Sequence, residues 1–202
     1  NHPDVLHLLG VISHQVGENY RAVDFIEKAL TVKPKFAGAH YNLGNVFKEL
    51  GQLDEAVASY HKAIGIRHDD AKAHNNLGLT FQELGQFDEA VAHYQKALVI
   101  RPDYAEVYNN LGLALQELER MDDSLNHYRK AIQIKPDYAE AHYNLGISLT
   151  KLGLLEEAAA QYYKAIQILP EFTEAHNNLG NTLKKLGRLD EAVDSYQKAI
   201  EI

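Results

Sequence analysis

Asparagine returns at one position of this sequence every 34 residues, in five consecutive copies. The copies are Asn42, Asn76, Asn110, Asn144 and Asn178. An amide offers two donors and two acceptor sites without a charge, so it can hydrogen-bond the backbone of an extended peptide of any sequence. Asparagine is also a mediocre helix former, costing up to about 0.7 kcal/mol relative to alanine. This recurrence favours a binding role; the alternative is that the asparagines bond one another or water and only keep a face solvated.

A second series lies three residues further along, at Asn45, Leu79, Leu113, Ile147 and Asn181. Three consecutive members are apolar, and a contiguous exposed apolar strip is typical of a binding site. The alternative is that neighbouring side chains cover the strip. Around it the charge changes along the chain, from Glu49, Glu83 and Glu117 to Lys151 and Lys185. This change could orient a peptide, or it is ordinary solvation of an exposed helix.

The remaining reactive residue types do not form a catalytic or metal-binding pattern. Of the eleven histidines, four share one phase of the period: His40, His74, His142 and His176. They come from separate repeats, and their spacing is too long for one ion with Zn–N bonds of about 2.0–2.1 Å. We expect packed histidines with hydrogen-bonded rings. Cysteine is absent, and no HExxH, P-loop or dinucleotide fingerprint occurs. We therefore expect no catalytic residue, no metal and no cofactor, so this segment is not an enzyme.

The elements that carry these residues follow from the same period. Six glycines are spaced 34 residues apart: Gly10, Gly44, Gly78, Gly112, Gly146 and Gly180. A fixed period of this length indicates stacked supersecondary units. We divide residues 1–202 into a single array of six repeats, at about 3–36, 37–70, 71–104, 105–138, 139–172 and 173–202, the last incomplete.

The second repeat shows why each unit is a helix–turn–helix hairpin. Its first helix places His40, Leu43 and Gly44 on one face at helical spacing, which leaves the asparagines opposite the core. Gly51 ends that helix, since glycine takes the left-handed conformation without steric cost. A second helix begins near Asp54, because acidic residues favour the positive end of the helix dipole. In the fourth repeat Glu119 replaces the turn glycine, so we expect a slightly strained connection there.

Leu9-Gly10, Ala22, Ile26, Ala29 and Pro34, with their echoes in later repeats, resemble the tetratricopeptide repeat pattern. The resemblance implies an all-α, right-handed superhelical solenoid whose first helices line a concave groove. The asparagine series is also similar to the arrays that precede the catalytic domain of O-linked N-acetylglucosamine transferases and bacterial relatives. That resemblance implies that the asparagines hold peptide backbone. The carboxylate clamp of some co-chaperone repeats is not indicated, since its cation positions hold Tyr41 and Glu106.

Composition limits the partners. A net charge of −8 argues against nucleic acid, whose phosphates require a basic surface. No apolar run reaches the length needed to cross a bilayer, so no membrane partner is expected. The absence of cysteine suits a cytoplasmic location. The chain starts at Asn1 and its only methionine is Met121, so we expect that the natural N-terminus has been removed, and a targeting segment could have been lost with it.

We therefore expect a scaffold that binds a protein or extended peptide in its groove. One alternative is the substrate-recruiting arm of a glycosyltransferase-like enzyme whose catalytic domain is absent. Another is an assembly scaffold that acts through its ends or its convex face. Because Val193 and Ile200 would be covered by a further helix in an internal repeat, we expect self-association through the C-terminal end.

Overall fold

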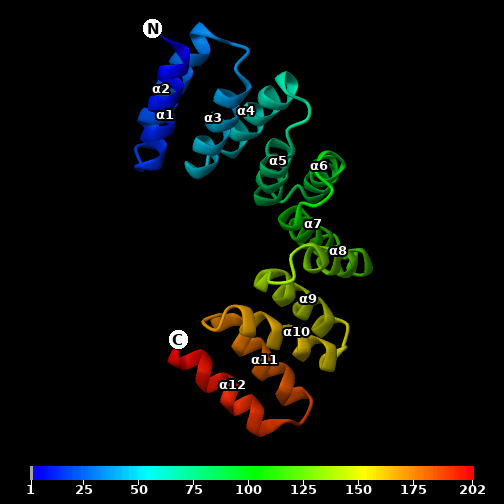
Figure 1. Ribbon diagram of the computed structural model, residues 1–202. Helices are drawn as coiled ribbons and strands as arrows, with labels where there is room; N and C mark the ends of the chain where they lie inside the picture. The colour runs from blue at the N-terminus through cyan, green and yellow to red at the C-terminus, as the bar shows by residue number, and fades with distance from the viewer. Residues whose placement is uncertain (1) are drawn as a thin grey trace. The chain divides into compact units, whose positions relative to one another are not determined.

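The computed structural model describes residues 2–202, and in that range it contains twelve helices and no strand (Figure 1). The helices are α1 (Pro3–Gln15), α2 (Asn19–Val32), α3 (Ala37–Glu49), α4 (Leu53–Ile66), α5 (Ala71–Glu83), α6 (Phe87–Ile100), α7 (Ala105–Glu117), α8 (Met121–Ile134), α9 (Ala139–Lys151), α10 (Leu155–Ile168), α11 (Thr173–Lys185) and α12 (Leu189–Glu201). Each odd-numbered helix pairs with the next helix as a hairpin. The predicted all-α series of helical hairpins is therefore confirmed. Within residues 2–202, no helix has both the length and the apolar character needed to span a bilayer.

The hairpins form two compact units, Asn1–Pro102 and Asp103–Ile202. In the first unit α2 packs on α3 and α4 packs on α5, while α3 also contacts both α1 and α5. In the second unit α8 packs on α9 and α10 packs on α11, while α9 also contacts both α7 and α11. Each unit therefore carries a row of neighbouring first helices, as expected where every repeat contacts mainly its neighbours.

The repeated glycine of the first helix lets the hairpin close on a buried tyrosine. A Cβ atom added to Gly44 would lie 2.7 Å from the ring of Tyr60, far inside van der Waals contact. The same pairing joins Gly112 to Tyr128, where the added Cβ would lie 2.6 Å from the ring. Tyr60 and Tyr128 are completely buried. This close approach explains why only glycine recurs at that phase.

The turn inside each hairpin takes the left-handed backbone conformation. Glycine provides it at Gly17, Gly51, Gly85, Gly153 and Gly187, with φ between 72° and 80°. In the fourth repeat Glu119 adopts the same region, with φ of 59°. That conformation brings the Cβ of an L-residue close to the backbone, which is the physical basis of the strain expected in this turn.

Candidate functional site

The asparagines of the 34-residue series are half-buried on the first helices, and most of them hydrogen-bond the preceding repeat. Four amide nitrogens donate to the side chain 35 residues earlier: Asn42 to His7 Nε2 (2.8 Å), Asn76 to Tyr41 Oη (3.0 Å), Asn144 to Asn109 Oδ1 (3.0 Å) and Asn178 to Tyr143 Oη (3.1 Å). The asparagines thus link neighbouring first helices within each unit. These partners were not predicted from the sequence, although Tyr41, Asn109 and Tyr143 each directly precede an asparagine of the series.

The amide of Asn76 is largely engaged, since its nitrogen donates to both Tyr41 and Asn45 and its oxygen accepts from Asn75, whereas the links leave part of the amide unused in the second unit. In Asn144 and Asn178, the amide nitrogen is the side-chain atom engaged with another described residue. Their Oδ1 atoms and second N–H groups remain available, because an amide has two donors and two acceptor sites. For Asn144 and Asn178 the two interpretations of the series are therefore compatible, with one N–H joining the repeats and the oxygen left for a ligand.

In the hairpins that carry the second series, its residue decides which acceptor is reached by the tyrosine that packs on the first-helix glycine. Tyr60 donates to Asn45 Oδ1 (2.7 Å) and Tyr196 donates to Asn181 Oδ1 (2.9 Å). Where the series is apolar, the hydroxyl pairs one helical turn later, as in Tyr94 with Gln82 Oε1 (3.0 Å) and Tyr162 with Thr150 Oγ1 (3.2 Å). Burial raises the pKa of Tyr60 and Tyr94, so these hydroxyls stay protonated and need an acceptor.

The fourth repeat departs from this rule. Its second-series residue is Leu113, and the next acceptor along the helix, Gln116 Oε1, already accepts from Ser148 (2.7 Å). The buried hydroxyl of Tyr128 consequently has no hydrogen-bond partner among the described residues. Asn45 and Asn181 therefore have a structural role that the sequence analysis did not anticipate.

The apolar members of the second series are half-covered. Leu79 lies in the first unit, whereas Leu113 and Ile147 lie in the second and pack against its buried cluster, which includes Leu145 and Tyr162. Part of each side chain remains accessible. We call the first-helix surface that carries both series the ladder face.

In the second unit the ladder face contains a pocket of about 660 Å³. Its lining comes from α9, α10 and α11 and consists of Ile147, Thr150, Lys151, Tyr162, Asn178, Asn181, Thr182, Lys184 and Lys185. Ile147, Asn178 and Asn181 were expected from the sequence as binding residues, and Lys151 and Lys185 as the basic end of this face. Lys184 was not, although it directly precedes Lys185. We call this the basic pocket.

The first unit has a smaller pocket on its ladder face, of about 400 Å³. Its lining is His14, Asn45, Lys48, Glu49, Tyr60, Asn76 and Glu83, so it also brings together two expected residues, Asn45 and Asn76. Here the charges pair across helices. Lys48 Nζ lies 2.9 Å from Glu83 and His14 Nδ1 lies 3.0 Å from Glu49. We call this the paired pocket.

The histidines that share a phase are packed against the connections between repeats. His40, His142 and His176 donate from Nε2 to the carbonyl oxygens of the prolines six residues earlier, at 2.9, 3.1 and 3.0 Å. His74 Nδ1 instead lies 3.1 Å from His93 Nδ1. Within residues 2–202, no group of three histidine, aspartate or glutamate side chains is arranged to hold a metal ion.

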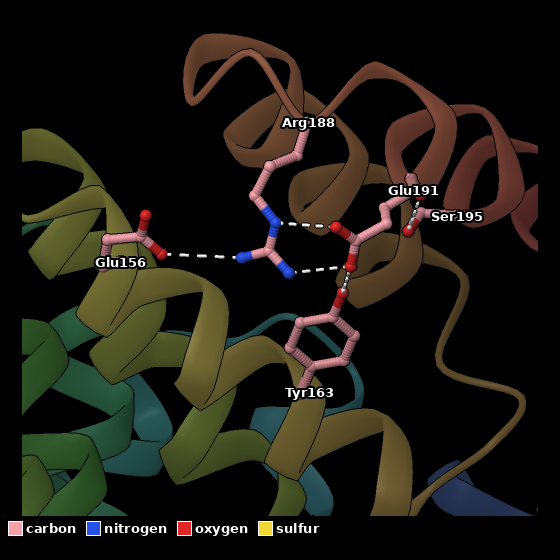
Figure 2. Close-up of polar contacts among 5 residues, drawn as sticks. All are labelled: Glu156, Tyr163, Arg188, Glu191 and Ser195. Atoms are coloured by element: carbon pink, nitrogen blue, oxygen red, sulfur yellow. Dashed lines mark hydrogen bonds and ion pairs between the residues drawn. The ribbon is translucent and has the colours of Figure 1, made fainter.

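A polar cluster on the second unit joins α10 to α12, away from the first-helix row (Figure 2). Arg188 donates from Nε and Nη2 to the two carboxylate oxygens of Glu191, at 2.8 and 2.7 Å, and its Nη1 lies 3.5 Å from Glu156. Tyr163 also donates to Glu191, at 3.1 Å, and burial raises the pKa of Tyr163. Exposed ion pairs stabilise proteins little, so we assign this cluster to positioning the start of α12.

Helical hairpins with a left-handed turn and a glycine against a buried side chain define the chain as an all-α repeat protein. Tetratricopeptide repeat models match residues 3–36, 25–58, 69–137, 103–171 and 173–202, and a TPR repeat model matches residues 44–85. The chain belongs to the tetratricopeptide repeat family, as its sequence motifs indicated. Every matching family model describes this repeat and none describes a catalytic family. No curated protein matches the sequence.

Solved structures share this fold. MamA is 28% identical with a TM-score of 0.73, and the match covers 79% of this chain and 93% of MamA. YrrB, described as a TPR protein with an unusual peptide-binding site, is 25% identical with a TM-score of 0.70, covering 87% of this chain and 91% of YrrB. PilF of Pseudomonas aeruginosa is 22% identical with a TM-score of 0.84, covering 96% of this chain and 88% of PilF; at that identity the likeness shows the fold alone.

Proposed function

We propose that this chain is a protein-interaction module whose ladder face holds an extended segment of a partner protein. The observation that carries the proposal is the basic pocket, which brings Ile147, Asn178 and Asn181 together around an accessible volume of about 660 Å³. The similarity to YrrB, whose description names a peptide-binding site, supports a peptide as the ligand. In the first unit, Asn42, Asn45, Asn76 and Leu79 would contribute to the equivalent face.

The proposed binding mechanism uses the hydrogen-bonding groups of the amides that are not engaged within the protein. Asn144 and Asn178 each keep an acceptor oxygen and a second N–H after bonding the preceding repeat. These groups match the N–H and C=O of an extended main chain, which otherwise loses water without compensation on binding. The accessible parts of Leu113 and Ile147 would cover an apolar side chain of the ligand. Affinity would then come from main-chain hydrogen bonds and specificity from the pockets.

The experiment is a selection of random peptides on the purified chain, followed by titration of the enriched peptides. Asn178→Ala removes both the repeat link and the ligand contact, whereas Tyr143→Phe removes the partner oxygen of that link and keeps Asn178. We expect Asn178→Ala to weaken binding about tenfold, the worth of one or two hydrogen bonds, and Tyr143→Phe to have little effect. If no peptide is enriched, or if the two variants bind alike, the proposed role of the asparagines is wrong.

A separate observation favours self-association as a second mode. Val193 on α12 is 52% exposed, whereas its counterparts in the two preceding repeats, Leu125 and Ala159, are 5% and 2% exposed. Ile200 is 84% exposed, whereas its counterparts Ile132 and Ile166 are half-buried. The covered residues pack in the buried cluster of the second unit. The apolar face of α12 could therefore accept a second copy of the chain.

A further inference from the structure

The cations of the basic pocket have no counter-ions. Lys151 lies in the last turn of α9, and Lys184 and Lys185 lie in the last turn of α11. All three side chains line the pocket, and its lining contains no acidic residue. Each of the three residues is exposed, and none forms an ion pair or side-chain hydrogen bond with another described residue. Three like charges around one hollow repel one another, so an anionic ligand would relieve that repulsion.

In the paired pocket, the charged side chains at the corresponding repeat positions form ion pairs within the protein. Glu49 and Glu83 occupy the repeat position that Lys151 and Lys185 occupy in the second unit. There Lys48 pairs with Glu83 at 2.9 Å, and Glu49 pairs with His14 at 3.0 Å. The fold therefore allows ion pairs across this face, and the second unit does not contain them.

The uncharged residues that line the basic pocket indicate which class of anion fits. Ile147 and the buried ring of Tyr162 supply apolar surface, while Asn178 and Asn181 supply neutral polar groups. A polyanion such as nucleic acid is disfavoured by the net charge of −8. Carboxylates spaced along a peptide can reach separate lysines while a neighbouring apolar side chain covers Ile147.

We infer that the basic pocket binds an acidic segment of a partner protein, with its aspartate or glutamate carboxylates on Lys151, Lys184 and Lys185 and an adjacent apolar side chain on Ile147. This inference rests on the proposed function, since it names the class of peptide that the ladder face of the second unit selects. Lysines in the last turn also complement the helix dipole. That contribution affects stability and not the choice of peptide, so binding measurements separate the two roles.

The test compares peptide selections on the intact chain and on the variant Lys151→Gln, Lys184→Gln, Lys185→Gln. From a random library, the wild-type chain should enrich peptides rich in aspartate and glutamate next to an apolar residue. The triple variant should lose that acidic bias. For the most enriched acidic peptide, we expect the triple variant to weaken binding about tenfold, because each exposed pair contributes modestly, and we expect added salt to reduce the difference.

Two further variants make the result decisive. Lys130→Gln, Lys164→Gln, Lys198→Gln removes the same charge from exposed positions of the second unit outside the basic pocket, and it should keep the acidic bias. Lys151→Glu with Lys185→Glu copies the residues of the paired pocket and should reject acidic peptides. If peptides are enriched without acidic bias, or if the bias survives in the triple glutamine variant, the inference fails while peptide binding stands. If no peptide is enriched on the wild-type chain, the proposed function fails, and the inference fails with it.

Discussion

His74 and His93 form a buried pair in the third repeat, with their Nδ1 atoms 3.1 Å apart. The ring of His61 lies 5.7 Å from that of His93, centroid to centroid, and the ring of Phe81 lies 5.5 Å from it. Burial lowers the pKa of His93 to about 4, helped by the nearby charge of Lys96 and by the other two histidines. The pKa values of His74 and His61 are also lowered, mainly by burial. Protonation of this cluster therefore opposes folding.

Stability should fall as the pH drops from about 6.5 to about 4, because the unfolded chain takes up a proton there that folded His93 does not. The full difference is on the order of 3 kcal/mol, from about 1.4 kcal/mol per pKa unit. His93→Gln should remove most of this dependence, since it copies the fifth repeat, where Gln161 faces His142 at 2.8 Å. Urea unfolding at neutral pH and near pH 5 measures the effect. An equal loss in His93→Gln and in wild type would exclude the pair as its source, and His2→Gln, at an exposed site, is the control.

At the residue scale, the sequence identified the chemistry of the asparagines but not their partners. Their period was enough to place them at one position of the first helices, and their role in holding peptide backbone stays a prediction. The pairing of Asn178 with Tyr143 depends on the 35-residue offset between neighbouring first helices, which is set by packing. The choice of acceptor for the tyrosine hydroxyl in each of these hairpins could have been predicted in part. Asn45 and Asn181 occur where the residue one turn on is Lys48 or Lys184, which cannot accept a hydrogen bond.

The turn between α7 and α8 is the element that departs most from its counterparts. Glu119 holds φ of 59° where the other hairpins have glycine. An L-residue in this conformation costs about 1 kcal/mol, whereas glycine adopts it freely. The sequence predicted the strain because every other turn has glycine at this phase.

Glu119→Gly should raise the free energy of unfolding by about 1 kcal/mol, because it removes the left-handed strain. The matched control is Gly153→Ala in the next repeat, where φ is 77° and an added Cβ meets no atom within 4 Å. That change isolates the backbone cost and should lower stability by a similar amount. Denaturant unfolding of both variants measures the effect. A lower stability of Glu119→Gly would mean that the glutamate side chain compensates for its backbone.

At the scale of whole elements, periodicity predicted the hairpins well. The boundary between α3 and α4 is marked locally by Gly51 in the left-handed conformation and by the acidic first turn of α4, with Asp54 and Glu55. The partial burial of the Leu113 and Ile147 side chains could not be predicted from periodicity. Both residues pack against side chains from other helices of the second unit, and a helical wheel contains no information about those neighbours.

For the molecule as a whole, the sequence predicted the change from acidic to basic along the ladder face but not its consequence. Glu49 and Glu83 are paired with His14 and Lys48, so the first unit presents little net charge in its pocket. The pairing requires side chains from adjacent first helices to meet, which is a tertiary property. On the ladder face, the basic pocket of the second unit instead presents three lysines without ion-pair partners, and this is where we place recognition of an acidic partner.

The apolar face of α12 exposes Val193 and Ile200 to solvent. Burying Val193 and Ile200 against a second copy could contribute about 1.5–3 kcal/mol per side chain, enough for association at raised concentration. Light scattering over a concentration series should show a mass that increases for the wild-type chain and stays constant for Val193→Lys with Ile200→Lys. Val99→Lys is the matched control, because Val99 is equally apolar and 83% exposed on α6 but lies on another helix, so it should leave association unchanged. A wild-type mass that stays at that of one chain throughout the series would contradict association through this face.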